Sequence, residues 1–219
     1  MKYKIKEIVD GIFMAEFDNG YDLSMTFLRY QEFYESPNPK FKGKQFTIID
    51  FMEWYSKENG NGVFTYPNDW AGFNVPLDVI IKVQSKIQGE GYIKDWNKYD
   101  DVMFDILMPI ESVRGRGDDR RSYLIGITKG SDSVMKHEIA HGLYHVYTKY
   151  RNSMNKLYSN LSLKSKKSLE SKFKKMGYHK SVWKDEAQAY LSTGDYLTAA
   201  ERKPFVELLK FYEENLSWG

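Results

Sequence analysis

Hydrophobic residues in the first half of the chain occur in short groups separated by turn residues, which is typical of a mixed α/β fold. Gly11–Phe17 is apolar and is followed by a turn sequence, so we predict a strand there. In three later segments the apolar residues recur every three or four positions, which is the spacing of one helix face. The predicted helices are Asp22–Tyr34, Ile48–Ser56 and Leu77–Gln88, with an aromatic loop at Val63–Val75.

A charged segment lies between two further strand candidates. Alternating apolar residues predict a strand at Asp101–Met108, and the apolar run Tyr123–Thr128 predicts another. The two strands are expected to form a hairpin whose tip is the charged segment Arg114–Arg121. Such a tip is most often a solvated surface feature, although an Arg-Gly-Arg-Gly stretch can also bind phosphates.

The second half of the chain is predicted to be almost wholly helical from Ser131 onward. Glycines that end helices and prolines that begin them set the expected boundaries. The predicted helices are Val134–Tyr150, Leu163–Met176, Val182–Thr193 and Pro204–Leu216. We therefore expect one α+β domain over residues 1–219, with a mixed α/β lobe at 1–130 and a helical lobe at 131–219.

The composition of the chain narrows the chemistry that it can perform. The 219 residues include 32 Lys and Arg, 30 Asp and Glu, four His and no Cys. Without Cys, disulfides, thiolate metal sites and a cysteine nucleophile are excluded, so any metal must be held by His, Asp or Glu. The net charge of only +2 argues against a dedicated nucleic-acid-binding protein.

No segment of the sequence resembles a targeting or membrane-spanning element. The N-terminal sequence lacks the apolar run and the small-residue cleavage site of a secretory signal. No later stretch approaches the roughly 18 consecutive apolar residues of a transmembrane helix. We therefore expect a cytoplasmic protein that does not associate with membranes.

The string His137-Glu138-Ile139-Ala140-His141 carries the strongest chemical signal in the sequence. Residues four apart lie on one helix face, about 6 Å apart along the axis, so both imidazoles can bind one Zn²⁺. Glu138 lies beside them, where its carboxylate can take a proton from a metal-bound water. The opposite helix face is apolar, so the helix is expected to bury that face and to present its histidines.

A catalytic zinc ion usually has a third protein ligand, for which the sequence offers several candidates. His145 lies about 12 Å along the helix from His137, too far to share the ion. We expect it to face the substrate, to support a ligand from outside the metal site or simply to be partly exposed. Glu186 is the preferred ligand because Ala187 and Ala189 on the same predicted helix allow close approach to a neighbouring helix. The alternative ligands are Asp185 and His179.

The segment His137–His145, together with Asp185–Tyr190, resembles the gluzincin branch of zinc metallopeptidases. In that branch HExxH supplies two histidines and a later helix supplies a glutamate, which corresponds here to Glu186. HEIAHGLYH is also similar to the HExxHxxxH string of ImmA/IrrE-type peptidases. The resemblance covers residues 123–194 and implies a zincin-like fold, in which an edge strand precedes the HExxH helix and binds an extended peptide.

The resemblance also implies a substrate and a reaction. The residues expected to contact a peptide or protein substrate along the edge strand are Tyr123, Leu124, Ile125 and Gly126. The implied reaction is hydrolysis of a peptide bond by a zinc-bound water, with Glu138 as the general base. The expected zinc ligands are His137, His141 and Glu186. The candidates for stabilising the oxyanion are Tyr190, His179, Tyr144 and Tyr178.

Two other classes of function stay open at the level of the sequence. A non-catalytic protein could use the same ligands only to join two helices, although such a site has no need of Glu138. A nucleic-acid-binding protein could use the Lys-rich segment Lys164–Lys180 together with Arg114–Arg121. The apolar stripe of Leu169, Phe173 and Met176 favours instead an ordinary helix with a solvated basic face.

Overall fold

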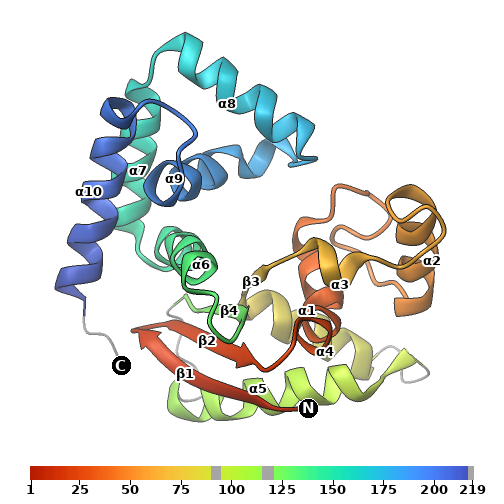
Figure 1. The fold of residues 1–219 in the computed structure, drawn as a ribbon. Helices are drawn as coiled ribbons and strands as arrows, with labels where there is room; N and C mark the ends of the chain where they lie inside the picture. Colours follow the sequence, from red (N-terminus) through yellow and green to blue (C-terminus); the bar gives the residue numbers. More distant parts are fainter. Residues whose placement is uncertain (90–94, 115–120, 217–219) are drawn as a thin grey trace.

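A computed structural model describes residues 1–89, 95–114 and 121–216, and its centre is a four-stranded sheet (Figure 1). The strands are β1 (Tyr3–Val9), β2 (Ile12–Phe17), β3 (Gly72–Pro76) and β4 (Tyr123–Thr128). Their order across the sheet is β1-β2-β4-β3. β2 pairs antiparallel with β1 and parallel with β4, whereas β3 pairs antiparallel with β4. The predicted strands at Gly11–Phe17 and Tyr123–Thr128 are confirmed.

The central strands of the sheet are buried on both faces. In β4, Leu124 faces one hydrophobic core, whereas Tyr123 and Ile125 face the other. Neighbouring residues of β2 divide in the same way, with Phe13 in the first core and Met14 in the second. This double burial explains why β4 is a continuous apolar run in the sequence and not an alternating one.

The first core joins one face of the sheet to helices from the N-terminal part of the chain. α1 begins after Asn19, whose side chain accepts a hydrogen bond from the Asp22 backbone N–H, as helix N-caps do. The helices predicted at Asp22–Tyr34, Ile48–Ser56 and Leu77–Gln88 are confirmed by α1, α2 and α4. The helices of this part are α1 (Gly20–Glu35), α2 (Ile48–Glu58), α3 (Tyr66–Asp69), α4 (Leu77–Gly89) and α5 (Lys98–Arg114).

The second core joins the opposite face of the sheet to helices from the C-terminal part, drawn from green to blue in Figure 1. They are α6 (Asp132–Val146), α7 (Thr148–Asn160), α8 (Leu163–Lys175), the 3₁₀ turn η2 (Lys180–Val182), α9 (Trp183–Thr193) and α10 (Ala199–Asn215). The mixed α+β architecture with a helical C-terminal part is therefore confirmed. None of the described helices combines the length and the hydrophobicity that crossing a lipid bilayer requires.

The Lys-rich helix α8 packs as its apolar stripe predicts. Leu169 and Phe173 are fully buried, and most of the lysines in this helix are exposed. Met176, expected in the same stripe, follows the helix and is 43% exposed. The basic face is thus an exposed helix surface over a buried apolar seam.

The strand predicted at Asp101–Met108 is wrong, because this segment belongs to helix α5. The buried residues Met103, Ile106 and Ile110 recur at helical spacing. The sequence looks alternating because α5 also exposes large apolar side chains on its outer face. The expected hairpin is therefore absent from the described residues, and most of its predicted tip, Arg114–Arg121, lies outside them.

The helix predicted at Val134–Tyr150 is two helices in the structure. α6 ends at Val146, and Tyr147 departs from helical geometry, with φ −98° and ψ 100°, before α7 begins at Thr148. The sequence has neither glycine nor proline at this break, so no local signal marks it. The pattern of apolar residues also predicts neither the rest of α7 nor the strands β1 and β3.

The peptide-binding edge strand expected at Tyr123–Thr128 is also a wrong prediction. β4 is an interior strand that pairs with β2 on one side and with β3 on the other. Its backbone from Tyr123 to Gly126 is already paired and cannot accept an added strand. β3 is the edge strand on this side of the sheet, and it contacts α6.

Candidate metal centre

Helix α6 holds the HExxH residues close to the sheet. It contacts β2, β3 and β4, and a Cβ atom added to Gly142 would lie 3.0 Å from the Ile12 side chain. Gly142 thus permits the close approach, and α6 runs through this residue without a break. Ile139 and Leu143 are buried in the second core. α6 also packs against α9, which brings residues of the two helices together.

Two histidines of α6 and a glutamate of α9 form a group that could hold a metal ion. One ligand atom from each of His137, His141 and Glu186 lies within 4.8 Å of the others. The two Nε2 atoms are 3.3 Å apart, and His141 Nε2 is 3.9 Å from Glu186 Oε2. The sequence leaves Asp185 and His179 open as third ligands, but neither joins this group in the described part of the chain.

Hydrogen bonds on the far side of each imidazole determine which nitrogen faces the group. Asp185 Oδ1 lies 2.8 Å from His141 Nδ1, so the carboxylate accepts the Nδ1 proton. Thr193 donates its hydroxyl proton to the Ala189 carbonyl at 2.7 Å and therefore accepts from His137 Nδ1 at 3.2 Å. Both Nε2 atoms are left to face each other. Two ring nitrogens at this distance require a shared cation, either a proton or a metal ion.

Glu186 gives the clearest indication that a ligand completes the group. Its side chain is 5% exposed, and Oε2 has no hydrogen-bond partner among the described residues. A buried carboxylate oxygen without a partner is unfavourable, so such an atom indicates an ion or a water at the site. Two imidazoles and one carboxylate are a donor set that suits zinc and leaves a further coordination position open. The residues present therefore fit a metal ion.

The electrostatics of the metal-free group also favour a bound cation. Burial and the neighbouring His141 lower the pKa of His137 to about 3, so this imidazole is neutral at pH 7. Burial alone would lower the pKa of His141, but the nearby carboxylates, chiefly Asp185 and Glu186, outweigh it and raise that pKa well above its usual value. Burial raises the pKa of Glu186 to about 7. The carboxylates around His141 therefore have only its imidazole as a positively charged neighbour within this group.

Glu138 is held beside the metal group by the edge strand β3. Asn74 Nδ2 donates to Glu138 Oε2 at 2.5 Å, and the Tyr123 hydroxyl donates to Asn74 Oδ1. Because Asn74 Oδ1 accepts from Tyr123, the amide NH₂ group must face Glu138. Gly72 leaves room for the other carboxylate oxygen, since a Cβ atom there would lie 2.8 Å from Glu138 Oε1. Burial raises the pKa of Glu138.

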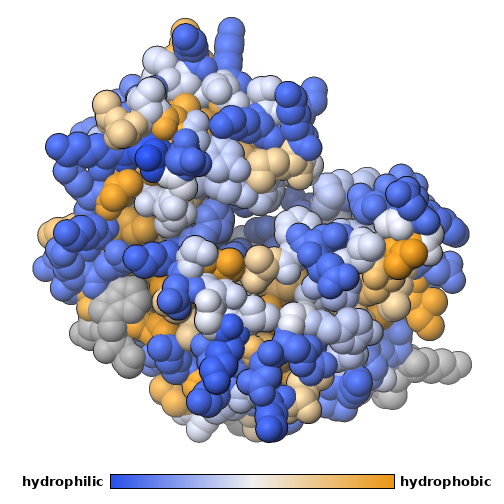
Figure 2. Space-filling view, viewed as in Figure 1, coloured by the Kyte–Doolittle hydropathy of each residue, from blue (hydrophilic) through white to orange (hydrophobic). Residues whose placement is uncertain are grey.

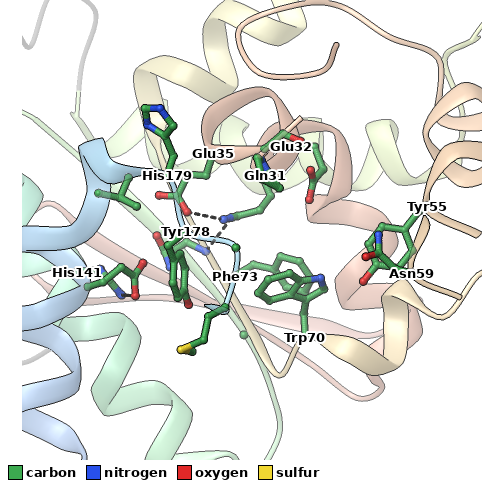
Figure 3. Close-up of a pocket in the computed structure, with 18 of the residues that line it drawn as sticks. Gln31, Glu32, Glu35, Tyr55, Asn59, Trp70, Phe73, His141, Tyr178 and His179 are labelled. Atoms are coloured by element: carbon green, nitrogen blue, oxygen red, sulfur yellow. Dashed lines mark hydrogen bonds and ion pairs between the residues drawn. The ribbon is translucent and has the colours of Figure 1, made fainter. Parts of the chain in front are cut away.

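The metal group opens into a cleft between the two sets of helices. A cavity of about 400 Å³ reaches His137, Glu138, His141 and Glu186. Its other walls come from α1, α2 and β3 on one side and from residues 176–182 on the other. The space-filling view is hollowed at this place (Figure 2), and a close-up shows side chains from both sides pointing into the cavity (Figure 3).

Of the side chains expected to stabilise the oxyanion, Tyr178 and His179 line the cavity, whereas Tyr190 lies behind its wall. The Tyr190 ring packs 4.7 Å from the His137 ring, and its hydroxyl lies 3.3 Å from that of Tyr178. Tyr178 and His179 both line the cavity, and His179 is exposed. Tyr178 and His179 can therefore reach a bound molecule, whereas Tyr190 supports the orientation of a ligand histidine.

His145 lies outside the metal group, as the geometry of an unbroken helix predicts. Its ring packs on Tyr123, with 5.1 Å between the ring centroids. Tyr144, one residue earlier, donates its hydroxyl proton to Asn155 Oδ1 at 2.9 Å. Neither His145 nor Tyr144 lines the cavity. The position of His145 does not support the expected substrate-facing role.

The sequence does not point to Asn74, Gln31 or Glu35, which also line the cavity. Asn74 belongs to a segment that reads as an aromatic loop, and its partner Glu138 is 64 positions away. Gln31 and Glu35 look like ordinary polar positions of an amphipathic helix. Contacts between such distant residues leave no local pattern, so only the fold identifies them.

Known proteins provide no independent assignment for this site. No protein-family model matches the chain, and no curated protein and no solved structure is significantly similar to it. The zincin-like fold and the likeness to gluzincins therefore stay predictions, and the functional argument rests on the geometry of α6, α9 and β3.

Proposed function

We propose that the protein is a zinc-dependent metallopeptidase that hydrolyses peptide bonds in the cleft beside α6. The observation that carries this proposal is that two imidazoles and Glu186 converge while Glu138 lines the same cavity. Three protein ligands with an adjacent carboxylate are typical of catalytic zinc sites, which keep a coordination position open. A site that only joined two helices would need neither Glu138 nor the cavity.

Glu138 has the surroundings that a general base requires. A zinc ion held by the three ligands would polarise the scissile carbonyl and lower the pKa of a bound water toward about 7. Glu138 would accept a proton from the attacking water and pass it to the leaving amine. Because Asn74 donates to Oε2, the other carboxylate oxygen, Oε1, is the one free to carry that proton. Burial favours the protonated form, which acts as the acid in the second step.

β3 offers the backbone groups that would hold an extended peptide. Leu77 N–H donates to the Ser122 carbonyl, so strand alternation directs the backbone groups of Gly72 and Asn74 away from β4. The Asn74 N–H is bonded to Gln31 Oε1, so Gly72 and the Asn74 carbonyl are the groups that a peptide could pair with. Both residues line the cavity. A peptide added to β3 as a strand would lie beside Glu138, whose carboxylate contacts these same two residues. β3 therefore replaces Tyr123–Thr128 as the proposed substrate-binding strand.

The proposal is tested with untagged, zinc-reloaded protein and its Glu138→Gln variant. We expect about one zinc ion per chain in both proteins, measured by elemental analysis, because Glu138 is not a ligand. Hydrolysis of a peptide library, followed by mass spectrometry, should fall by about 100- to 10,000-fold in the variant, since the base is lost. Undiminished turnover by Glu138→Gln would contradict the assigned role. Stoichiometric zinc without any turnover would support the non-catalytic alternative.

A further inference from the structure

The cleft is lined by carboxylates, aromatic rings and imidazoles. Among the described residues that line it there is neither Lys nor Arg, although the whole chain has a net charge of +2. The two positive charges of a zinc ion would balance Glu138 and Glu186, which leaves the other carboxylates uncompensated. The cavity therefore favours a cationic guest. Its acidic lining residues are Glu32, Glu35, Glu58, Glu138 and Glu186.

Glu35 is the carboxylate that lines the cavity at the C-terminal end of α1, one helix turn after Gln31. Gln31 Nε2 donates to Glu35 Oε2 at 3.1 Å, and this is its one hydrogen bond to the described residues. In Figure 3 the Glu35 carboxylate lies on the side of Gln31 that faces Tyr178 and His141. Glu35 does not belong to the group of ligand atoms that lie within 4.8 Å of one another, although it lines the same cavity.

Glu35 is unfavourably placed for the helix that carries it. It is the last residue of α1, and the last turn of this helix contains no basic residue. The carbonyl groups at a helix C-terminus carry partial negative charge, which disfavours a carboxylate there. Burial and the neighbouring carboxylates, Glu186 first, raise the pKa of Glu35 to about 8. A cation beside Glu35 would relieve both effects, just as a metal would satisfy the unpartnered Oε2 of Glu186.

Gln31, which is bonded to Glu35, also closes the outer edge of β3 near its C-terminal end. Gln31 Oε1 accepts the Asn74 backbone N–H at 3.3 Å, so its amide occupies the place where a peptide would pair. Beyond Asn74 the edge offers no further donor, because Pro76 has no N–H and α4 begins at Leu77. A peptide running antiparallel to β3 has its N-terminal side at this end. The residue before the scissile bond would therefore lie next to Glu35.

We infer that Glu35 binds a primary ammonium group carried by the substrate residue that precedes the scissile bond. The inference rests on the proposed peptidase function and specifies its substrate class. The ammonium group can be a free N-terminal amine or a lysine side chain, because both offer three N–H donors to a carboxylate. Trp70, Phe73 and Tyr178 line the same cavity, where their rings can contact the cation or its alkyl chain.

Binding of matched peptides to zinc-loaded Glu138→Gln protein tests the inference independently of turnover. One pair is the amide of alanyl-phenylalanyl-alanine with a free or an acetylated N-terminus. The other pair is acetyl-lysyl-phenylalanyl-alanine amide and its norleucine analogue. We expect the cationic member of one pair to bind about tenfold more tightly by calorimetry, and the responsive pair identifies the source of the ammonium group.

Adding Glu35→Gln to this protein should reduce that preference to less than about twofold, with the affinity for the neutral peptides unchanged. Glu35→Asp should restore part of the preference, because it restores the charge. Glu53→Gln is the matched control, since Glu53 is an exposed residue of α2 that does not line the cavity. It should leave the preference as it is.

Several results would overturn the inference. They are equal binding of cationic and neutral peptides, absence of peptide binding, and a preference that survives Glu35→Gln. Two zinc ions per chain in the wild type and one in Glu35→Gln would also overturn it, because Glu35 would then be a metal ligand.

Wild-type turnover without preference for cationic peptides would refute the inference and leave the peptidase proposal intact. Zinc binding and cation-selective peptide binding without turnover would refute only the peptidase proposal.

Discussion

Two buried polar clusters in this protein contain similar groups, but only one of them is complete. In the first core, Arg29 donates to Asp100 Oδ1 at 3.0 Å and to Asp95 Oδ2 at 2.8 Å. A further Arg29 N–H donates to the Phe46 carbonyl at 2.9 Å. Between α6 and α9, by contrast, Glu186 Oε2 has no hydrogen-bond partner within the described residues, and His141 Nε2 lies 3.9 Å from it. The first cluster contains a guanidinium that is always charged, whereas the second has only imidazoles to offset its carboxylates.

Buried charged groups that satisfy one another stabilise the fold. Buried charged groups that lack a partner are instead typical of a binding site. Charged groups are tolerated in a protein interior when they are paired and fully hydrogen-bonded. The arginine cluster meets this condition without a ligand. The α6–α9 cluster leaves Glu186 Oε2 without a hydrogen bond to the described residues, so changes in this cluster should depend on zinc, whereas changes in the arginine cluster should not.

The largest effect on stability is expected from Arg29→Ala. The change leaves Asp100, which is 3% exposed, as an unpaired buried carboxylate. Breaking a buried pair in this way lowers the free energy of unfolding by about 3–5 kcal/mol. Urea denaturation should show this loss equally with zinc and with a chelator. Lys57→Ala, at an exposed position of α2, is the control, and a loss seen only with zinc would contradict the comparison.

Glu32 provides an intermediate case, a buried carboxylate with neither an arginine nor a metal partner. It accepts the Tyr66 hydroxyl proton at 3.0 Å, and burial raises its pKa from 4.5 to about 7. Between these pH values the folded state keeps a proton that the unfolded chain has lost, so stability falls as the pH rises. This term approaches about 3 kcal/mol by pH 7. Glu32→Gln should therefore flatten the curve of unfolding free energy against pH, and an unchanged slope would exclude this origin.

Zinc affinity should respond most strongly to Glu186→Ala. Loss of a metal ligand should weaken zinc binding by more than about 100-fold, which exceeds the usual effect of removing an outer partner. In the metal-free protein the same change removes a buried carboxylate whose Oε2 has no hydrogen bond to the described residues, so we expect little loss of stability. His145→Ala is the control, since His145 is outside the group. A competition assay with a chelating dye measures both variants, and a large loss only in His145→Ala would require a different ligand set.

The smallest effect is expected from Asp185→Asn, which weakens the hydrogen bond to His141 without changing the shape of the side chain. Outer partners of metal-binding histidines contribute roughly 10- to 100-fold to affinity, and we expect the lower value because the amide can still accept. The same dye competition detects this change. Asp195→Asn, at an exposed position after α9, should have no effect.

The group of His137, His141 and Glu186 could be predicted from the sequence because its signals are local. The spacing of His137 and His141 is set by one helix turn, and Glu186 follows from small neighbours on a second amphipathic helix. The structure brings these residues together in a continuous α6. Such signals have a limit. The sequence does not predict the strands β1 and β3 and predicts a strand in place of the helix α5, because the burial of these elements depends on which other elements cover them.

The remaining part of the site depends on the order of strands in the sheet. An apolar strand next to the HExxH helix looks the same in sequence whether it is an edge or an interior strand. β4 is interior because β3, from far earlier in the chain, pairs with it. That pairing also brings Asn74 to Glu138 and to Gln31. Long-range topology of this kind cannot be read from one sequence.

The parallel pairing of β2 with β4 has a consequence for how the chain folds. Ile12 pairs with Tyr123, which lies 111 positions later in the chain. The segment between them contains β3 and most residues of the first core. Closing so long a loop is entropically unfavourable and slows folding. α6 packs on both strands, and Gln188 of α9 then donates to the Ala140 carbonyl of α6 at 3.1 Å. A refolding chain should therefore capture zinc late, and the rate of metal uptake should report the moment at which the sheet closes.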